Sequence, residues 1–218
     1  MKTALVAGAT GAVGKALVYQ LIEDPAYLKV ITVSRKPLPI KHHKVVQVVV
    51  DYDRLDTVAD QLSADDVYCC LGTTIKAAGS RDEFYKVDHD YVLKVARLGK
   101  KQGAGQFILV SAMGADPGSS LFYNRVKGEA ERDVGLLRYE TVIVVRPSLL
   151  IASRVEFRPG ETIAKYVMKA TGFLMLGPLK KYKAIPVETV AKAMRYYGAQ
   201  QLKGQQIILN DQLFVKAL

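Results

Sequence analysis

Seven residues near the start of the chain read Gly8-Ala9-Thr10-Gly11-Ala12-Val13-Gly14, and they follow a short apolar run at residues 3–7. A helical pattern of apolar residues starts within this glycine loop and extends from residue 11 to residue 22. Glycines between a strand and a helix predict a tight turn with close backbone approach to a ligand, whose pyrophosphate would meet the N–H groups of the helix N-terminus. A turn without a ligand is the alternative.

Short β-branched runs and longer amphipathic segments alternate through most of the chain. This alternation predicts an α/β fold of Rossmann type, with a doubly wound parallel sheet buried on both faces. After residue 7 we expect strands at 30–33, 45–50, 67–70, 107–110, 141–145 and 206–209, and helices at 55–62, 81–102, 121–137, 162–171 and 187–197.

The 218 residues fall within the range that α/β folds occupy as one unit. Beyond residue 147 the pattern loosens, and prolines and glycines punctuate it. We predict one domain over residues 1–218, with a cofactor-binding core at 1–147 and a small C-terminal elaboration on the substrate side at 148–218.

The formal net charge of +10 favours an anionic partner without selecting one. No run of five like charges marks a nucleic-acid arm, and no apolar stretch reaches the length of a membrane span, so neither partner is predicted. The two cysteines, Cys69 and Cys70, are adjacent on an expected strand and point to opposite faces, which suits neither a disulfide nor a metal site. We therefore expect a cytoplasmic protein. The three histidines lack metal-ligand spacing, so no metal is predicted.

Cofactor specificity is predicted from the end of the second strand. Arg35 lies 21 residues beyond Gly14, close to where an NAD site carries an acidic residue. A guanidinium there can hold a 2′-phosphate, which favours NADP(H) over NAD(H), although a surface cation is the alternative. Asp51 could accept a hydrogen bond from adenine or cap a helix, and Gly72 and Thr73 could contact the cofactor or form a plain turn.

Ser111, Tyr123 and Lys127 are the candidate catalytic residues. Tyr123 and Lys127 are four residues apart on an expected helix, so they share a face, and Ser111 ends the preceding strand. The Lys127 cation would lower the pKa of the Tyr123 phenol and could hold ribose hydroxyls, while Ser111 would orient a substrate carbonyl. A buried tyrosine beside a snorkelling lysine is the alternative.

Five longer segments of the sequence resemble a known protein family. The segments 69–74 (Cys-Cys-Leu-Gly-Thr-Thr), 87–94, 123–129, 146–147 and 158–161 resemble the human Tat-interacting protein family, in the atypical branch of the short-chain dehydrogenase/reductase superfamily. This resemblance implies an NADP(H)-binding Rossmann domain with an intact Ser-Tyr-Lys set. Taken together, the predicted cofactor contacts are Gly8, Thr10, Gly11, Ala12, Val13, Gly14, Arg35, Asp51, Leu71, Gly72, Thr73, Tyr123 and Lys127. The resemblance does not imply a substrate.

Two functions of different classes follow. The first is an NADP(H)-dependent oxidoreductase that acts on a carbonyl or alcohol as a small-molecule substrate. The second is a non-catalytic scaffold or sensor, in which NADP(H) changes the surface offered to a protein partner. A nucleotide-sugar epimerase is less favoured, because few residues follow the core. The sequence leaves open whether the chain forms a homo-oligomer.

Overall fold

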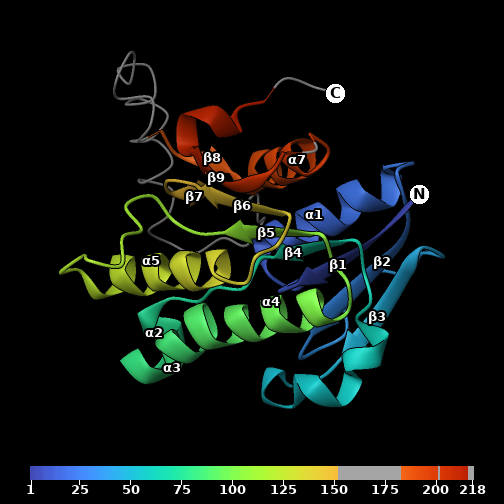
Figure 1. Ribbon diagram of the computed structural model, residues 1–218, viewed down its shortest axis with the longest axis horizontal. Helices are drawn as coiled ribbons and strands as arrows, with labels where there is room; N and C mark the ends of the chain where they lie inside the picture. Colours follow the sequence, from blue (N-terminus) through green and yellow to red (C-terminus); the bar gives the residue numbers. More distant parts are fainter. Residues whose placement is uncertain (152–182, 201, 216–218) are drawn as a thin grey trace, which may run out of the picture.

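Seven parallel strands form the central sheet in the order β3-β2-β1-β4-β5-β6-β9 (Figure 1). The computed structural model describes residues 1–151, 183–200 and 202–215. The strand order reverses between β1 and β4, which makes the carboxyl ends of these strands the expected ligand site of a doubly wound sheet. The predicted Rossmann-type fold is confirmed. The strands are β1 (Lys2–Ala7), β2 (Tyr27–Ser34), β3 (Val45–Val49), β4 (Asp66–Cys69), β5 (Gln106–Val110), β6 (Thr141–Arg146) and β9 (Gly204–Leu209).

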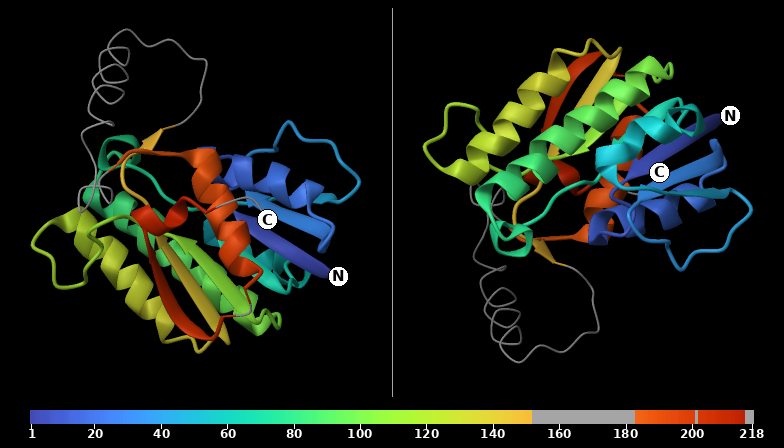
Figure 2. Two further views of the ribbon diagram at one scale, coloured as in Figure 1. Left: turned by 90° about the horizontal axis from the view of Figure 1, so that it is seen from above. Right: turned by 90° about the horizontal axis from the view of Figure 1, so that it is seen from below.

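Helices cover both faces of the sheet (Figure 2). On one face α1 (Ala12–Glu23) packs beside α7 (Val187–Gly198), and on the other α4 (Tyr91–Lys101) packs beside α5 (Phe122–Gly135). Successive residues of β1 alternate between the two apolar cores, with Val6 in the first and Leu5 in the second. Because both faces of the sheet are buried, the strands are apolar at successive positions, as the sequence predicts.

The two cysteines follow the same alternation. Cys69 lies in the core beneath α4, and Cys70 packs against the core beneath α1. Burial raises the pKa of the Cys69 thiol to about 12, so this thiol is protonated and unreactive near neutral pH. The prediction that their side chains point to opposite faces is confirmed.

Short elements complete the described chain. They are η1 (Tyr52–Gln61), α2 (Ile75–Ala78), α3 (Arg81–Tyr85), η2 (Lys86–Asp90), η4 (Asn210–Leu213), and a two-stranded parallel pair, β7 (Leu150–Ile151) with β8 (Ile185–Pro186). None of the described helices is both long and apolar enough to cross a bilayer.

Two predicted helices differ in the structure. The segment 55–62 lies mostly in the 3₁₀ element η1, whose regular hydrogen bonding is interrupted by non-helical backbone at Arg54 and Val58. The segment 81–102 is divided into α3, η2 and α4, because the π-helical turn η2 carries the two buried polar residues Asp88 and His89 toward partners. The predicted helix at 162–171 lies outside the described residues.

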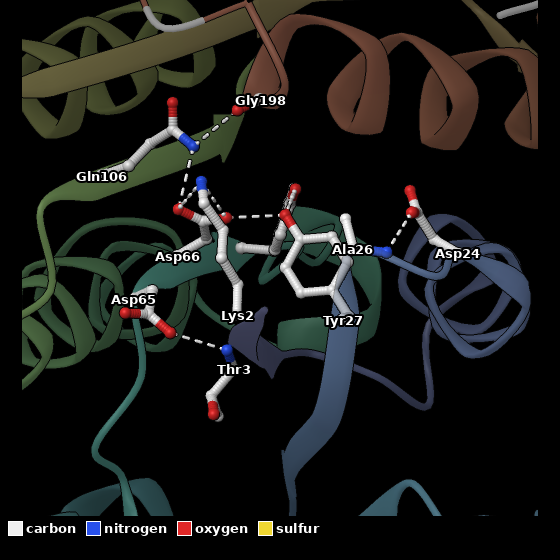
Figure 3. A network of polar contacts seen from close by, with 10 residues as sticks. Lys2, Thr3, Asp24, Ala26, Tyr27, Asp65, Asp66, Gln106 and Gly198 are labelled. Atoms are coloured by element: carbon white, nitrogen blue, oxygen red, sulfur yellow. Dashed lines mark hydrogen bonds and ion pairs between the residues drawn. The ribbon is translucent and has the colours of Figure 1, made fainter.

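A buried polar network closes the amino-terminal edge of the sheet (Figure 3). The Asp66 carboxylate, 2 % exposed, accepts hydrogen bonds from Lys2 Nζ at 3.0 Å, Tyr27 Oη at 2.6 Å and Gln106 Nε2 at 3.1 Å. These contacts join β1, β2, β4 and β5 at the edge opposite the glycine loop. Three donors to one buried carboxylate stabilise that edge of the sheet.

Candidate functional site

The glycine loop forms the turn that the sequence predicts. Gly8 has a φ of +77°, and a Cβ there would lie 2.6 Å from the Cys70 carbonyl oxygen. A Cβ on Gly14 would lie 2.3 Å from the Gly8 carbonyl oxygen, so these two positions exclude larger residues. Gly11 caps α1 without a side-chain hydrogen bond to the first turn. The helix N-terminus is therefore open to an anion.

Tyr52 fastens this loop to the neighbouring strand. Its phenol oxygen accepts a hydrogen bond from the Gly8 N–H at 3.0 Å and donates one to the Val33 carbonyl oxygen at 2.8 Å. The Tyr52 ring is buried and stacks on the Tyr91 ring at 5.4 Å between centroids. The loop and the carboxyl end of β2 are thus held at a fixed separation.

A first cavity of about 260 Å³ lies between the glycine loop and the end of β2. Arg35 and Glu83 are its charged residues, and Arg35 is exposed. Within the described part of the chain the Arg35 guanidinium forms no salt bridge, so it is available to an anionic ligand. Six other predicted cofactor contacts line this cavity: Gly8, Thr10, Gly11, Leu71, Gly72 and Thr73.

A second cavity of about 570 Å³ adjoins the first and shares part of its wall, including Gly11 and Gly72. Ala12 and Val13 of the glycine loop line it. The cavity also brings together the three residues predicted to be catalytic, namely Ser111, Tyr123 and Lys127. A ligand that spans both cavities would therefore reach from Arg35 to this triad.

Lys127 is a buried cation with a buried partner. Its Nζ lies 2.7 Å from Oδ1 of Asp88, whose side chain is fully buried, and Oδ2 of Asp88 accepts a hydrogen bond from the Thr73 N–H at 2.8 Å. Burial by itself lowers the pKa of Lys127, but the Asp88 carboxylate and Tyr123 oppose it and the net shift is upward. Lys127 is therefore charged near neutral pH.

Tyr123 is more accessible than Lys127, with 38 % of the residue exposed. Its ring contacts the Phe84 ring at 5.5 Å between centroids. The alternative interpretation required a buried tyrosine and a lysine that reaches solvent. The structure shows the opposite, since Lys127 is buried and Tyr123 lies at the cavity wall.

Ser111 is held from behind by an ion pair. Its hydroxyl donates a hydrogen bond to Oε1 of Glu131, a buried residue on α5. Arg146, at the end of β6, donates to both Glu131 oxygens, with Nη2 2.5 Å from Oε2 and Nε 3.0 Å from Oε1. Because Arg146 occupies both Glu131 oxygens as a donor, Glu131 serves as an acceptor and the hydroxyl proton of Ser111 is directed toward it.

Two predicted cofactor contacts line neither cavity. Gly14 packs behind the loop against Gly8. Asp51 is exposed, and its carboxylate accepts a hydrogen bond from the Asp53 N–H at 2.9 Å, which matches the helix-cap alternative.

His89 lies between the carboxylates of Asp90 and Asp133. No group of three metal-binding side chains occurs among the described residues.

No role was predicted from the sequence for Tyr52, Asp88, Glu131 or Arg146. Two of them carry a signal in the sequence: Asp88 falls four residues after Phe84 on the apolar face of its helical segment, and Glu131 falls four residues after Lys127. A carboxylate on an apolar face needs a buried partner. From the sequence we also expect Arg154 and Arg158, which follow the strand 141–145, either to bind an acidic substrate near the mouth of the site or to form ion pairs. Both lie outside the described residues.

Comparisons with known proteins agree with the loop and the fold. A family model described as NAD(P)H-binding matches residues 8–135. Protein HTATIP2 of Rattus norvegicus is 39 % identical over 214 residues, which cover 96 % of this chain and 86 % of that protein. The protein "fmp52, mitochondrial" of Aspergillus clavatus is 34 % identical over 222 residues, covering 99 % and 94 %.

Among solved structures, MoeE5 in complex with UDP-glucose and NAD superimposes with a TM-score of 0.72 at 16 % identity, covering 97 % of this chain and 79 % of that one. This likeness shows the fold alone. The mitochondrial names of the fungal relatives contradict the expectation of a cytoplasmic protein. That expectation was wrong because it rested on the two reduced cysteines, which do not distinguish one reducing compartment from another.

Proposed function

The chain belongs to the NAD(P)H-binding family and is a homologue of HTATIP2 and FMP52, and on this premise we propose that it is an NADP(H)-dependent oxidoreductase of the atypical short-chain dehydrogenase type. Its substrate would be a carbonyl compound or the corresponding alcohol. The observation that carries the proposal is the placement of Ser111, Tyr123 and Lys127 around one cavity continuous with the glycine loop.

The residues present fit the cofactor. A Cβ at Gly8 would collide with the backbone of residue 70, so the turn of this loop requires glycine, and α1 presents an uncapped N-terminus that can meet a pyrophosphate. The free Arg35 guanidinium at the first cavity supports selection of the 2′-phosphate, and therefore of NADP(H) over NAD(H). When bound, the nicotinamide supplies or accepts the hydride of a carbonyl–alcohol interconversion.

The side chains of the second cavity then have separate tasks. Tyr123, the accessible phenol, exchanges a proton with the substrate oxygen. Lys127 presents its ammonium beside Gly72, where it can hold ribose hydroxyls. Ser111 orients the same substrate oxygen, and to do so it exchanges its hydrogen bond to Glu131 for one to the substrate.

Turnover of a panel of aldehydes and ketones, followed by NADPH absorbance, tests the proposal. Tyr123→Phe should abolish turnover and leave NADPH affinity nearly unchanged, because it removes only the exchangeable proton. Tyr19→Phe is the matched control, since Tyr19 is exposed on α1 and should keep full activity. Equal loss of turnover and NADPH affinity in Tyr123→Phe would refute the role of this residue. Cofactor binding without turnover of any carbonyl or alcohol would favour the non-catalytic scaffold.

A further inference from the structure

The second cavity has an apolar wall on the side away from the glycine loop. The sheet order places β4 and β5 between β6 and β1, the strand that the glycine loop follows (Figure 1). Five apolar residues from the ends of β5 and β6 and from β7 line the cavity on this side, namely Val110, Ala112, Pro147, Leu149 and Leu150. We call this set the apolar wall. It begins at Ser111, whose two chain neighbours both belong to it.

Hydrogen bonds hold the backbone of the apolar wall in place. The Leu149 carbonyl oxygen accepts from the Ile185 N–H at 2.9 Å. The Ser148 N–H donates to Oδ1 of the buried Asn210 at 2.9 Å. The leucine side chains nevertheless remain accessible, since Leu149 is 62 % exposed and Leu150 is 40 % exposed. A ligand would therefore cover apolar side chains whose backbone is already ordered, which favours binding.

The same cavity offers no unpaired charge in the part of the chain that the structure describes. Its charged side chains are Asp88 and Lys127, which form a buried ion pair at 2.7 Å. Ser148 adds a hydroxyl, but this group donates to the Lys183 carbonyl oxygen. A phosphate or carboxylate on a substrate would lose water here without gaining a free cation, which is unfavourable. In this respect the second cavity differs from the first, where Arg35 is available.

We propose that the substrate is an uncharged aldehyde or ketone with a hydrocarbon chain, whose carbonyl lies at Ser111 and Tyr123 and whose chain lies along the apolar wall. The inference rests on the oxidoreductase function proposed above and adds the class of substrate. In the reduction, the carbonyl carbon accepts a hydride from NADPH and the carbonyl oxygen accepts a proton, so that an alcohol and NADP⁺ leave. Nucleotide sugars and carboxylic acids fall outside this class.

The first test uses unbranched aldehydes from propanal to decanal, reduced by the full chain at saturating NADPH. The value of kcat/KM should rise by about two- to fourfold for each added methylene until the hydrocarbon extends past the wall, as expected for burial of apolar surface. A second pair of substrates tests charge: hexanal and the aldehyde in which a carboxylate replaces its terminal methyl group. The charged aldehyde should have a kcat/KM at least about tenfold lower.

A substitution in the wall tests where the hydrocarbon chain lies. Leu149→Arg should lower kcat/KM for hexanal and raise it for the charged aldehyde, because it replaces apolar surface by a cation. Leu136→Arg is the matched control, since Leu136 is 71 % exposed and caps α5 at the end opposite Tyr123. It should change neither value, and both variants should bind NADPH as the wild type does.

The possible failures are distinguishable. A kcat/KM that does not depend on chain length, or a wild-type preference for the charged aldehyde, would overturn the apolar substrate class and leave the oxidoreductase function standing. Equal responses of Leu149→Arg and Leu136→Arg would overturn the placement of the chain along the apolar wall. If NADPH binds and no aldehyde of either kind is reduced, the proposed function fails and the inference fails with it.

Discussion

The Tyr52 phenol bridges the glycine loop and β2, because its oxygen accepts from the Gly8 N–H at 3.0 Å while its proton goes to the Val33 carbonyl oxygen. The loop therefore depends on a side chain that lies 44 residues away in the sequence. This bridge gives the loop its rigidity before any ligand binds.

Tyr52→Phe should lower the free energy of unfolding by about 1–3 kcal/mol, since it removes the hydrogen bonds to the Gly8 N–H and to the buried Val33 carbonyl. It should also weaken NADPH binding, because the loop loses its attachment to β2. Tyr139→Phe is the matched control: its phenol donates to the Ala96 carbonyl oxygen in the core beneath α4, away from both cavities. Urea unfolding and calorimetry should show similar destabilisation in the two variants but weaker binding only in Tyr52→Phe. Equal affinities would contradict a role for Tyr52 in the loop.

Gly8→Ala should be far more disruptive than Gly79→Ala. Both glycines have a positive φ, +77° and +88°, so each alanine carries a strain of about 1–2 kcal/mol. Only Gly8 also places the new Cβ against backbone, whereas nothing lies within 4 Å of a Cβ at Gly79. Thermal unfolding and NADPH titration should show a larger stability loss and abolished binding for Gly8→Ala, and a modest stability loss with normal binding for Gly79→Ala. Normal NADPH binding by Gly8→Ala would show that binding does not depend on this conformation of the glycine loop.

Glu131→Gln should lower the free energy of unfolding by about 3 kcal/mol, because it leaves Arg146 with a neutral partner in a buried setting. Turnover should fall as well, since glutamine offers a single neutral acceptor oxygen, for which Ser111 and Arg146 then compete. Asp53→Asn removes one partner of an exposed ion pair with Lys86 and should change stability little. If the two variants unfold alike in urea, the Glu131–Arg146 pair does not stabilise the site.

Acid should weaken the contact between η2 and α5. Hydrogen bonding from Arg132, assisted by His89 and opposed by partial burial, holds the pKa of Asp133 below its ordinary range. A carboxyl whose folded pKa is depressed stabilises the fold above its unfolded pKa, about 3.9, and this stabilisation is lost as pH falls through the folded pKa. Unfolding free energies measured from pH 6 to pH 2 should therefore fall less steeply in Asp133→Asn. A slope identical to that of the wild type would contradict this assignment.

The sheet and its principal helices could be predicted because their signals are local. β-branched runs such as residues 141–145 and the strand–glycine–helix pattern at residues 3–22 do not depend on distant contacts. The division of the expected helix 81–102 could not be predicted, since its π-helical turn is stabilised by Asp88 meeting Lys127 and His89 meeting Asp133, both on α5.

The same distinction applies to the site. Ser111, Tyr123 and Lys127 were found from spacing along one helix and the end of one strand. Tyr52 and Arg146 were not predicted because their roles arise from pairing between separate elements: Tyr52 of η1 bonds to the glycine loop, and Arg146 of β6 bonds to Glu131 of α5. Asp51 was predicted as a cofactor contact but caps η1 instead. An acidic residue after a strand suits either role, so the sequence does not distinguish them.

Calorimetric titration of cofactor-free protein with NADPH and with NADH, for the wild type and Arg35→Ala at one ionic strength, tests the central claim most directly. The wild type should bind NADPH more tightly than NADH. Arg35→Ala should weaken NADPH binding by about 10- to 100-fold, as expected for loss of a charge-assisted hydrogen bond, and leave NADH binding nearly unchanged. Equal affinity for the two cofactors, or equal loss of both in Arg35→Ala, would contradict NADP(H) selection by Arg35.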